Sequence, residues 1–162
     1  MISEKIILYP NDILKKKTQN VVNFDKSLNN IINKMKKIMV LNSGVGLAAN
    51  QVGLELSLFI AKPKDKFYVF INPEIISFKD EEIKEEGCLS IPNKWGIVKR
   101  YNEVKIKFYD LRGRKHTLKT KGLLAHIIQH EIDHLNGILF IEKALEVYDI
   151  NSDSLSKDDK KN

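Results

Sequence analysis

The sequence predicts an α+β domain in which antiparallel sheets pack around a central helix that carries candidate metal ligands. Apolar residues recur at spacings of three and four in residues 25–41 and 122–136, which is typical of amphipathic helices. Between these stretches lie short runs of β-branched and aromatic residues, which indicate strands. The composition does not shift along the chain, so we expect a single domain over residues 1–150 and a polar, disordered tail over 151–162.

The first helix is expected over residues 25–41, near the N-terminus. Asp25 stands where an N-cap is needed, and Asn42-Ser43-Gly44 ends the apolar repeat. The predicted apolar face consists of Leu28, Ile31, Ile32, Met35, Ile38 and Met39. One face of this amphipathic helix is therefore expected to pack on the core.

The strands are expected in the middle of the chain, at residues 56–60, 67–71, 74–78, 104–109 and 116–119. The first two form an antiparallel pair across the polar connection 62–66, and Asn72-Pro73 ends the second strand. An acidic patch follows the third strand. Residues 112–115 turn the fourth strand into the fifth, where His116 is expected to be an exposed strand residue rather than a ligand.

The second helix, at residues 122–136, is expected to end before Gly137. An extended piece at 138–141 and one more helix at 142–150 should follow it. The predicted core-facing stripe of the histidine-bearing helix consists of Leu123, Leu124, Ile127, Ile128 and Leu135. A rigid, buried helix of this kind is a suitable platform for metal ligands.

The composition excludes several classes of protein. Among 162 residues 43% are hydrophobic, and a single cysteine excludes an internal disulfide framework. The N-terminus lacks a secretory signal and no segment approaches the roughly 20 apolar residues of a membrane span, so we expect a cytoplasmic protein without a membrane partner. The net charge of +6 comes from dispersed lysines, which predicts no sequence-specific nucleic-acid binding but leaves a transient ribosome contact open. A monomer is expected.

The stretch His130-Glu131-Ile132-Asp133-His134 carries the candidate chemistry. Two histidines four residues apart share one helix face and can bind one metal ion, with Glu131 beside them as a candidate general base. A third histidine, His126, is roughly 12 Å from His134 along the helix axis at about 1.5 Å of rise per residue, too far to share one ion. Pairing His126 with His130 would put Ile127 where the base is needed. We therefore interpret His126 as a groove or surface residue.

The expected third ligand is Cys88, in the stretch Glu86-Gly87-Cys88-Leu89-Ser90. A catalytic zinc-type site takes three protein ligands and leaves a fourth position open for water or substrate. Two other interpretations of this cysteine stay open. It can be a nucleophile that works with a histidine, although that chemistry does not need an H-E-x-x-H pattern, or an inert buried thiol, which would leave the two histidines without a third ligand.

The segment Gly44-Val45-Gly46-Leu47-Ala48-Ala49-Asn50-Gln51 is rich in small residues that let the backbone approach another group. A phosphate-binding loop is one interpretation, but the segment lacks a Gly-Lys-Ser/Thr ending and follows no strand. A tight turn that lines a substrate groove fits better, with the side-chain amide of Gln51 as a hydrogen-bond donor.

Segments 44–51, 86–90 and 130–134 together resemble, in sequence and in order, the motifs of the peptide deformylase family. The resemblance extends from Ile7-Leu8-Tyr9-Pro10 to about Glu142. It implies a metal-dependent hydrolase that removes the N-formyl group from the initiator methionine of new polypeptides and releases formate. Its partners would be N-formylmethionyl peptides and nascent chains.

The resemblance also implies roles for individual residues. Cys88, His130 and His134 would bind one divalent metal ion, usually Fe²⁺ in the family, although Zn²⁺, Ni²⁺ or Co²⁺ can occupy the site. Glu131 would be the general base, and then the acid, when metal-bound hydroxide attacks the formyl carbon. Gln51 and the backbone N–H of Leu89 would donate hydrogen bonds to the resulting oxyanion.

A methionine side chain needs an apolar slot near the metal, and the candidates for its walls are Val45, Leu123 and Ile127. Gly46 and Gly87 would let the peptide backbone lie alongside the protein, which gives affinity without reading sequence. Tolerance of many residues after the methionine is therefore expected.

Two further residues near the predicted site have expected places. We expect Asp133 to have a structural role and to pair with Arg100. Trp95 is expected beside the groove, at a place where bacterial members of the family often carry a different residue, so the shape of the entrance should differ from theirs.

Two other functions fit parts of the pattern. A zinc-type peptidase would use the same H-E-x-x-H, but such enzymes commonly take a downstream Glu or His as third ligand rather than an upstream cysteine. A non-catalytic metal-binding domain would keep the ligands for folding, but it would need neither Glu131 nor Gln51.

Overall fold

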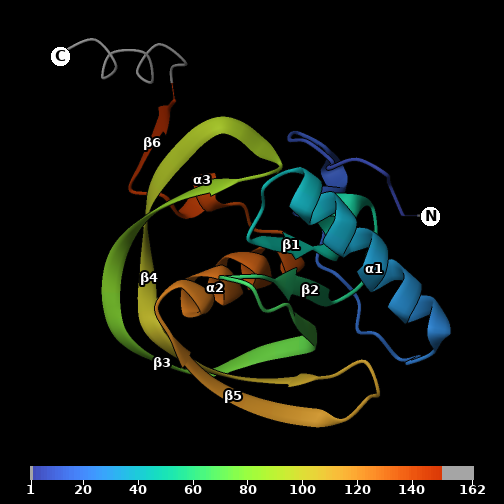
Figure 1. Cartoon of the computed structure of the whole chain (residues 1–162). Coiled ribbons are helices and arrows are strands. Elements are labelled where there is room, and N and C mark those ends of the chain that lie inside the picture. Colours follow the sequence, from blue (N-terminus) through green and yellow to red (C-terminus); the bar gives the residue numbers. More distant parts are fainter. Residues whose placement is uncertain (1, 151–162) are drawn as a thin grey trace, which may run out of the picture.

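The computed structural model describes residues 2–150, so the predicted tail at 151–162 lies outside the described residues. Helices and antiparallel strands are both present (Figure 1), which confirms the predicted mixed class. The helical elements are η1 (Asp12–Lys15), α1 (Lys26–Leu41), η2 (Ala49–Val52), α2 (Leu123–Leu135) and α3 (Phe140–Lys143). The strands are β1 (Gly46–Ala48), β2 (Leu58–Ala61), β3 (Tyr68–Cys88), β4 (Ile91–Tyr109), β5 (Lys115–Lys121) and β6 (Glu146–Asp149).

The strands form one connected sheet in the order β1-β2-β3-β4-β5, with β6 paired to β4. Every neighbouring pair of strands is antiparallel. The sequence predicted more than one sheet, and for the described residues this is wrong. The long pairing of β3 with β4, which runs from Ile71 opposite Tyr109 to Cys88 opposite Ile91, connects the short strands at both ends into the same sheet.

Strand β3 is much longer than predicted, because neither Asn72-Pro73 nor the acidic patch ends it. Asn72 takes a left-handed conformation (φ 48°) at an irregularity in the pairing after Ile71. Its side chain accepts a hydrogen bond from the Val21 amide and donates one to the Val21 carbonyl, each 2.8 Å long. Further along, β4 places cations opposite the acidic residues, with Lys99 Nζ 3.5 Å from Glu81. Cross-strand pairs of opposite charge make this sequence compatible with a strand.

Strand β2 is buried on both faces because it lies between the two long helices. Leu58 and Ile60 belong to the apolar cluster that contains the buried side of α1. Phe59 and Ala61 point to the opposite face and belong to the cluster that contains the buried side of α2. Successive side chains of a strand point to opposite faces, and both faces of β2 are covered by apolar side chains. The sequence of β2 is therefore apolar throughout and does not alternate with polar residues.

Helix α2 lies inside the bend of the β3–β4 hairpin (Figure 1) and packs on β1, β2, β4 and β5. The bounds of both long helices agree with the predictions, and Asp25 caps α1 by accepting a hydrogen bond from the Ser27 amide. For one residue of the predicted core stripe of α2, the prediction of burial is wrong. Leu123 is 51% exposed, because it is the first residue of the helix and its side chain lines an open cavity.

The C-terminal prediction is wrong in detail. A short helix occupies Phe140–Lys143, where an extended piece was expected, and residues 146–149 form β6 rather than part of a helix. The reason lies in β4, whose segment from Lys94 to Ile97 is not covered by β5 and pairs with β6 instead. Within residues 2–150, no helix combines the length and apolar character that crossing a membrane would require.

Candidate active site

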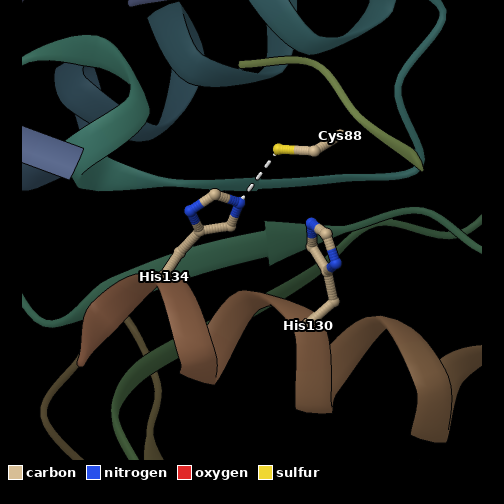
Figure 2. A group of neighbouring side chains, drawn as sticks. All are labelled: Cys88, His130 and His134. Atoms are coloured by element: carbon tan, nitrogen blue, oxygen red, sulfur yellow. Dashed lines mark hydrogen bonds between the residues drawn. The ribbon is translucent and has the colours of Figure 1, made fainter. Parts of the chain in front are cut away.

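Cys88, His130 and His134 come together into a group that could hold a metal ion. One potential ligand atom from each lies within 4.8 Å of the others, and Cys88 Sγ is 3.1 Å from His134 Nε2. Figure 2 shows both histidines rising from α2 toward the cysteine. His130 and His134 are one helical turn apart, as the four-residue spacing requires. Cys88 is at the end of β3, beside the short turn that leads into β4.

Gln51 lies beside this group in a fixed orientation. Its Oε1 accepts a hydrogen bond from the Ala48 amide at 2.9 Å, so the other end of the side chain must be the NH₂ group. That Nε2 donates to Ser90 Oγ at 3.1 Å and faces Cys88 Sγ at 3.5 Å. The tight turn of η2 therefore presents an amide donor to the cysteine, and Gln51 itself is buried.

Glu131 is buried next to the histidines, with 3% of its surface exposed. Within the described residues its Oε2 has no hydrogen-bond partner. Burial raises the pKa of this carboxyl from 4.5 to about 7, because a charged carboxylate is poorly stabilised away from water. A Cβ at Gly46 would overlap Glu131 Oε1 and the Ile127 side chain, so only glycine fits there. Oε2 of Glu131 is therefore free, whereas the backbone at Gly46 packs closely against Oε1.

Glu86 joins the site to a buried ion-pair network, of which the sequence predicted only the pair of Arg100 and Asp133. Its two oxygens accept hydrogen bonds from Arg100 Nη2 (2.6 Å) and Nε (2.9 Å). Arg100 Nη1 donates to Asp133 Oδ2 at 2.7 Å, which confirms the predicted pairing of Arg100 with Asp133. Lys143 Nζ also lies 3.0 Å from Asp133. Two carboxylates are thus balanced by two cations.

Glu86 also holds His130. Burial by itself would raise the pKa of Glu86, but hydrogen bonds with His126, His130 and Arg100 keep it well below the usual range. Glu86 is therefore an ionised acceptor, and His130 Nδ1, 2.9 Å from Oε1, must be its donor. This hydrogen bond leaves the other nitrogen of His130, Nε2, free to act as a ligand.

The pKa values of the two histidines of the metal-capable group are shifted in opposite directions. Burial lowers the pKa of both, but Cys88 and Glu86 more than compensate at His130, whose pKa lies well above 6.5. At His134 burial dominates, and the nearby charge of His130 adds to it, so the pKa lies well below 6.5. A metal ion that bound here would compete with protons mainly at His130.

A cavity of about 450 Å³ opens onto these groups. It is lined by Glu131, Gln51, Leu89 and two members of the metal-capable group, Cys88 and His130. The residues predicted to bind substrate line the same cavity, namely Val45, Gly46, Gly87, Leu123 and Ile127. Trp95 and His126 complete one side of it, and Trp95 is 38% exposed.

Residues 3–148 match the family described as polypeptide deformylase. The chain belongs to the peptide deformylase family. It is 44% identical to the peptide deformylase of Borreliella burgdorferi over 141 residues, which covers 85% of this chain and 86% of the relative. It is 40% identical to peptide deformylase 1 of Bacillus anthracis over 149 residues, which covers 91% and 96% of the two chains. The crystal structure of peptide deformylase from Thermotoga maritima matches with a TM-score of 0.86 at 34% identity, covering 90% of this chain and all of that one.

Peptide deformylases are metalloenzymes that act in protein biosynthesis, and the residues present here fit a metal ion. A thiolate and two imidazoles suit zinc and iron alike, and three ligands leave a position open for water or substrate. The unpartnered oxygen of Glu131 beside them is a second sign of fit, because an occupied site would supply it with a hydrogen-bond donor. The donor set alone does not choose among the metals.

The sequence predicted the three residues of the metal-capable group, but it did not predict which residues would contact them. Glu86 was named only as part of a motif, and His126 was expected in a groove or on the surface. Glu86 contacts both His126 and His130, and it is 44 residues from His130 in sequence. A signal existed in the regular spacing of three histidines on one helix, but it could not show which carboxylate they would meet.

Proposed function

We propose that this protein removes the N-formyl group from the initiator methionine of new polypeptides and releases formate. The observation that carries the proposal is that one cavity brings together three kinds of group: two members of the metal-capable triad (Cys88 and His130), a buried carboxylate with a free oxygen, and an oriented amide donor. Hydrolysis of a linear amide needs an activated water, a proton carrier and an oxyanion donor. A binding domain would need only the first of these groups.

Cys88, His130 and His134 would hold one divalent cation, with Fe²⁺ as our choice and Zn²⁺, Ni²⁺ or Co²⁺ as chemically acceptable alternatives. When bound, such a cation supplies Lewis acidity that makes water nucleophilic near neutral pH. The hydrogen bond from His130 Nδ1 to Glu86 fixes the imidazole that faces the cation.

Glu131 would carry the proton in both halves of the reaction. Its carboxylate accepts a proton from water as the new C–O bond forms at the formyl carbon. It then returns this proton to the nitrogen as the C–N bond breaks, so the products are formate and a free amine. A pKa near 7 suits both transfers at neutral pH, because the group can gain and lose the proton at little cost.

Gln51 Nε2 and the backbone N–H of Leu89 would donate hydrogen bonds to the oxygen that becomes negative during the attack. The amide of Gln51 is held in place by the Ala48 amide and Ser90, so only its weaker contact, to Cys88 Sγ at 3.5 Å, would have to be given up or shared. Such preorganised donors stabilise charge that develops in a transition state.

The methionine side chain would enter the part of the cavity lined by Val45, Leu123 and Ile127. The exposure of Leu123, which is unfavourable for a core residue, suits a wall that a substrate covers. Gly46 and Gly87 would let the peptide backbone approach, so the downstream sequence is expected to matter little. N-formylmethionyl peptides and nascent chains are therefore the proposed substrates.

The setting of the reaction is part of the proposal. We infer a monomeric catalytic domain over residues 1–150 that acts in the cytoplasm and meets the ribosome at most transiently. The charge of +6 is spread over lysines and supports only a weak attraction to polyanions, without sequence-specific nucleic-acid binding.

The test is formate release from a formyl-Met peptide by protein reconstituted anaerobically with Fe²⁺. Wild type should release formate, whereas Glu131→Ala with the same metal content should release almost none. If neither protein forms formate while both demonstrably hold metal, the proposed activity is wrong. Cleavage of an internal peptide bond instead would indicate a metallopeptidase.

A further inference from the structure

His126 is the one histidine of α2 outside the metal-capable group of Cys88, His130 and His134. It lies one helical turn before His130 and lines the same cavity. Its side chain is only 15% exposed, although a surface position was one expectation from the sequence. A largely buried imidazole on the cavity wall, one helical turn from a candidate ligand, needs a hydrogen-bond partner.

The partner is the carboxylate of Glu86, which His126 shares with His130. His126 Nε2 is 2.5 Å from Glu86 Oε2, and His130 Nδ1 is 2.9 Å from Glu86 Oε1. Arg100 adds one hydrogen bond to each oxygen. Each oxygen of Glu86 therefore faces one imidazole and one guanidinium nitrogen, and the carboxylate is held from both sides.

The charges in this network determine which way the hydrogen bonds run. Arg100 and Lys143 balance Glu86 and Asp133, so Glu86 is an ionised acceptor. His126 Nε2 must then carry a proton and donate it. Removing this donor would leave Oε2 with Arg100 Nε alone and would weaken the hold on the carboxylate that His130 contacts.

We propose that His126 is a positioning residue, which acts through Glu86 to hold ligand His130 in its metal-binding orientation. The inference rests on the proposed metal centre and adds a residue to it. His126 lies outside the metal-capable group, and its Nε2 is occupied by Glu86. Partners that orient a metal ligand contribute about 10–100-fold to metal affinity. A residue one step further away should contribute at the lower end of that range.

The test compares His126→Leu with His126→Gln in protein loaded with Co²⁺. Leucine fills the space but offers no donor, whereas the amide of glutamine offers an N–H in place of Nε2. His116→Ala is the matched control, because His116 Nε2 also pairs with a carboxylate, Asp110 at 2.9 Å, but on β5 and outside the cavity. The readouts are the rate of cobalt loss to a chelator and the visible absorption of the bound cobalt, with far-UV circular dichroism to establish folding.

We expect His126→Leu to lose cobalt about tenfold faster than wild type and to shift its absorption, with His126→Gln and His116→Ala both close to wild type. Equal rates and spectra for wild type and a folded His126→Leu would overturn the inference, even if that variant were less stable. Wild type that holds no cobalt would remove the metal centre itself, and this separate result would also end the proposed function.

A double variant tests whether the effect passes through Glu86. In Glu86→Gln protein, the further change His126→Leu should leave the cobalt-loss rate unchanged, since the link is already broken. If the two substitutions each increased the cobalt-loss rate and their factors multiplied, His126 would not act through Glu86. If Glu86→Gln does not fold, the difference between leucine and glutamine at position 126 still decides the question.

Discussion

Among the single residues, Glu131 combines deep burial with an oxygen that no described residue satisfies. Its pKa of about 7 means that the folded, metal-free protein binds a proton there that the unfolded chain, with a pKa near 4.5, does not bind. The protonated form is therefore the stable one in the fold. As the pH rises from 4.5 to 7 this contribution is lost.

We predict that Glu131→Gln stabilises the metal-free protein at pH 8. The substitution removes a buried charge whose cost is roughly 3 kcal/mol, from a pKa difference of about 2.5 and 1.36 kcal/mol for each pH unit. The advantage should shrink as the pH falls from 7 to 4.5 and vanish below that range. Urea unfolding of both proteins across this pH range measures it. An advantage that did not change with pH would mean that the Glu131 carboxylate is not the cause.

A second prediction at this scale concerns the oxyanion donor. Gln51→Leu should lower kcat by about 10²-fold, the usual effect of removing one such donor. Gln129→Leu is a suitable control, because Gln129 is also a buried glutamine but bonds only to the backbone of Tyr101 and Ala125. The control should lose stability and keep most of its kcat in the formate assay. A normal kcat for Gln51→Leu would exclude its proposed role.

At the scale of elements, the buried ion-pair network connects three elements, namely β3, β4 and α2. Arg100 on β4 joins Glu86 on β3 to Asp133 on α2, and it is 2% exposed. Further along the same two strands, Lys107 pairs with Glu74 at 3.0 Å, with 54% of the lysine side chain exposed. The two pairs share strands but differ in burial.

This difference predicts unequal costs of mutation. Arg100→Ala should destabilise the protein by about 3–5 kcal/mol, because it leaves the buried Glu86 without its cation and Asp133 with Lys143 alone. Lys107→Ala should cost about 0–1 kcal/mol, since water already screens that pair. Urea unfolding of the two variants at pH 7 provides the comparison. Equal losses would show that the buried network does not stabilise the fold.

The sequence predicted elements well where a local pattern decides them. The helical spacing of apolar residues located α1 and α2 to within about a residue. The sequence did not predict elements that depend on a neighbouring strand. The acidic part of β3, for example, forms a strand only because β4 pairs with it and supplies cations. Residues 146–149 likewise form β6 because β4 offers an uncovered edge. The candidate ligands followed from residue types, whereas the contacts of Glu86 span 14 to 44 residues and leave no local signal.

At the scale of the whole molecule, the described fold rests on three apolar clusters, and of the metal-capable residues only Cys88 packs against one of them. One apolar cluster surrounds α1, a second surrounds α2 and a third lies around Leu139 and Phe140. The site occupies the wall of a cavity beside the second cluster. The metal should therefore contribute to stability by binding, and it should not be a condition of folding.

We predict that removing the metal with a chelator abolishes formate release while the far-UV circular dichroism stays unchanged. Returning Fe²⁺ should restore activity and raise the Tm with increasing metal concentration, as expected for a ligand that binds only the folded state. A loss of secondary structure on chelation would instead identify a structural metal. Zinc added in the same way distinguishes a general effect of divalent ions from one specific to iron.

The positions of the ligands along the chain also have a kinetic consequence. His130 and His134 are neighbours on α2, but Cys88 is 46 residues from His134 and Gln51 is 37 residues from Cys88. Closing such long loops costs entropy that only the completed hairpin and helix can repay. A partly folded chain can thus offer a cation two imidazoles but not the thiolate. The rate at which refolding protein acquires tight metal binding therefore reports when its most distant segments have met.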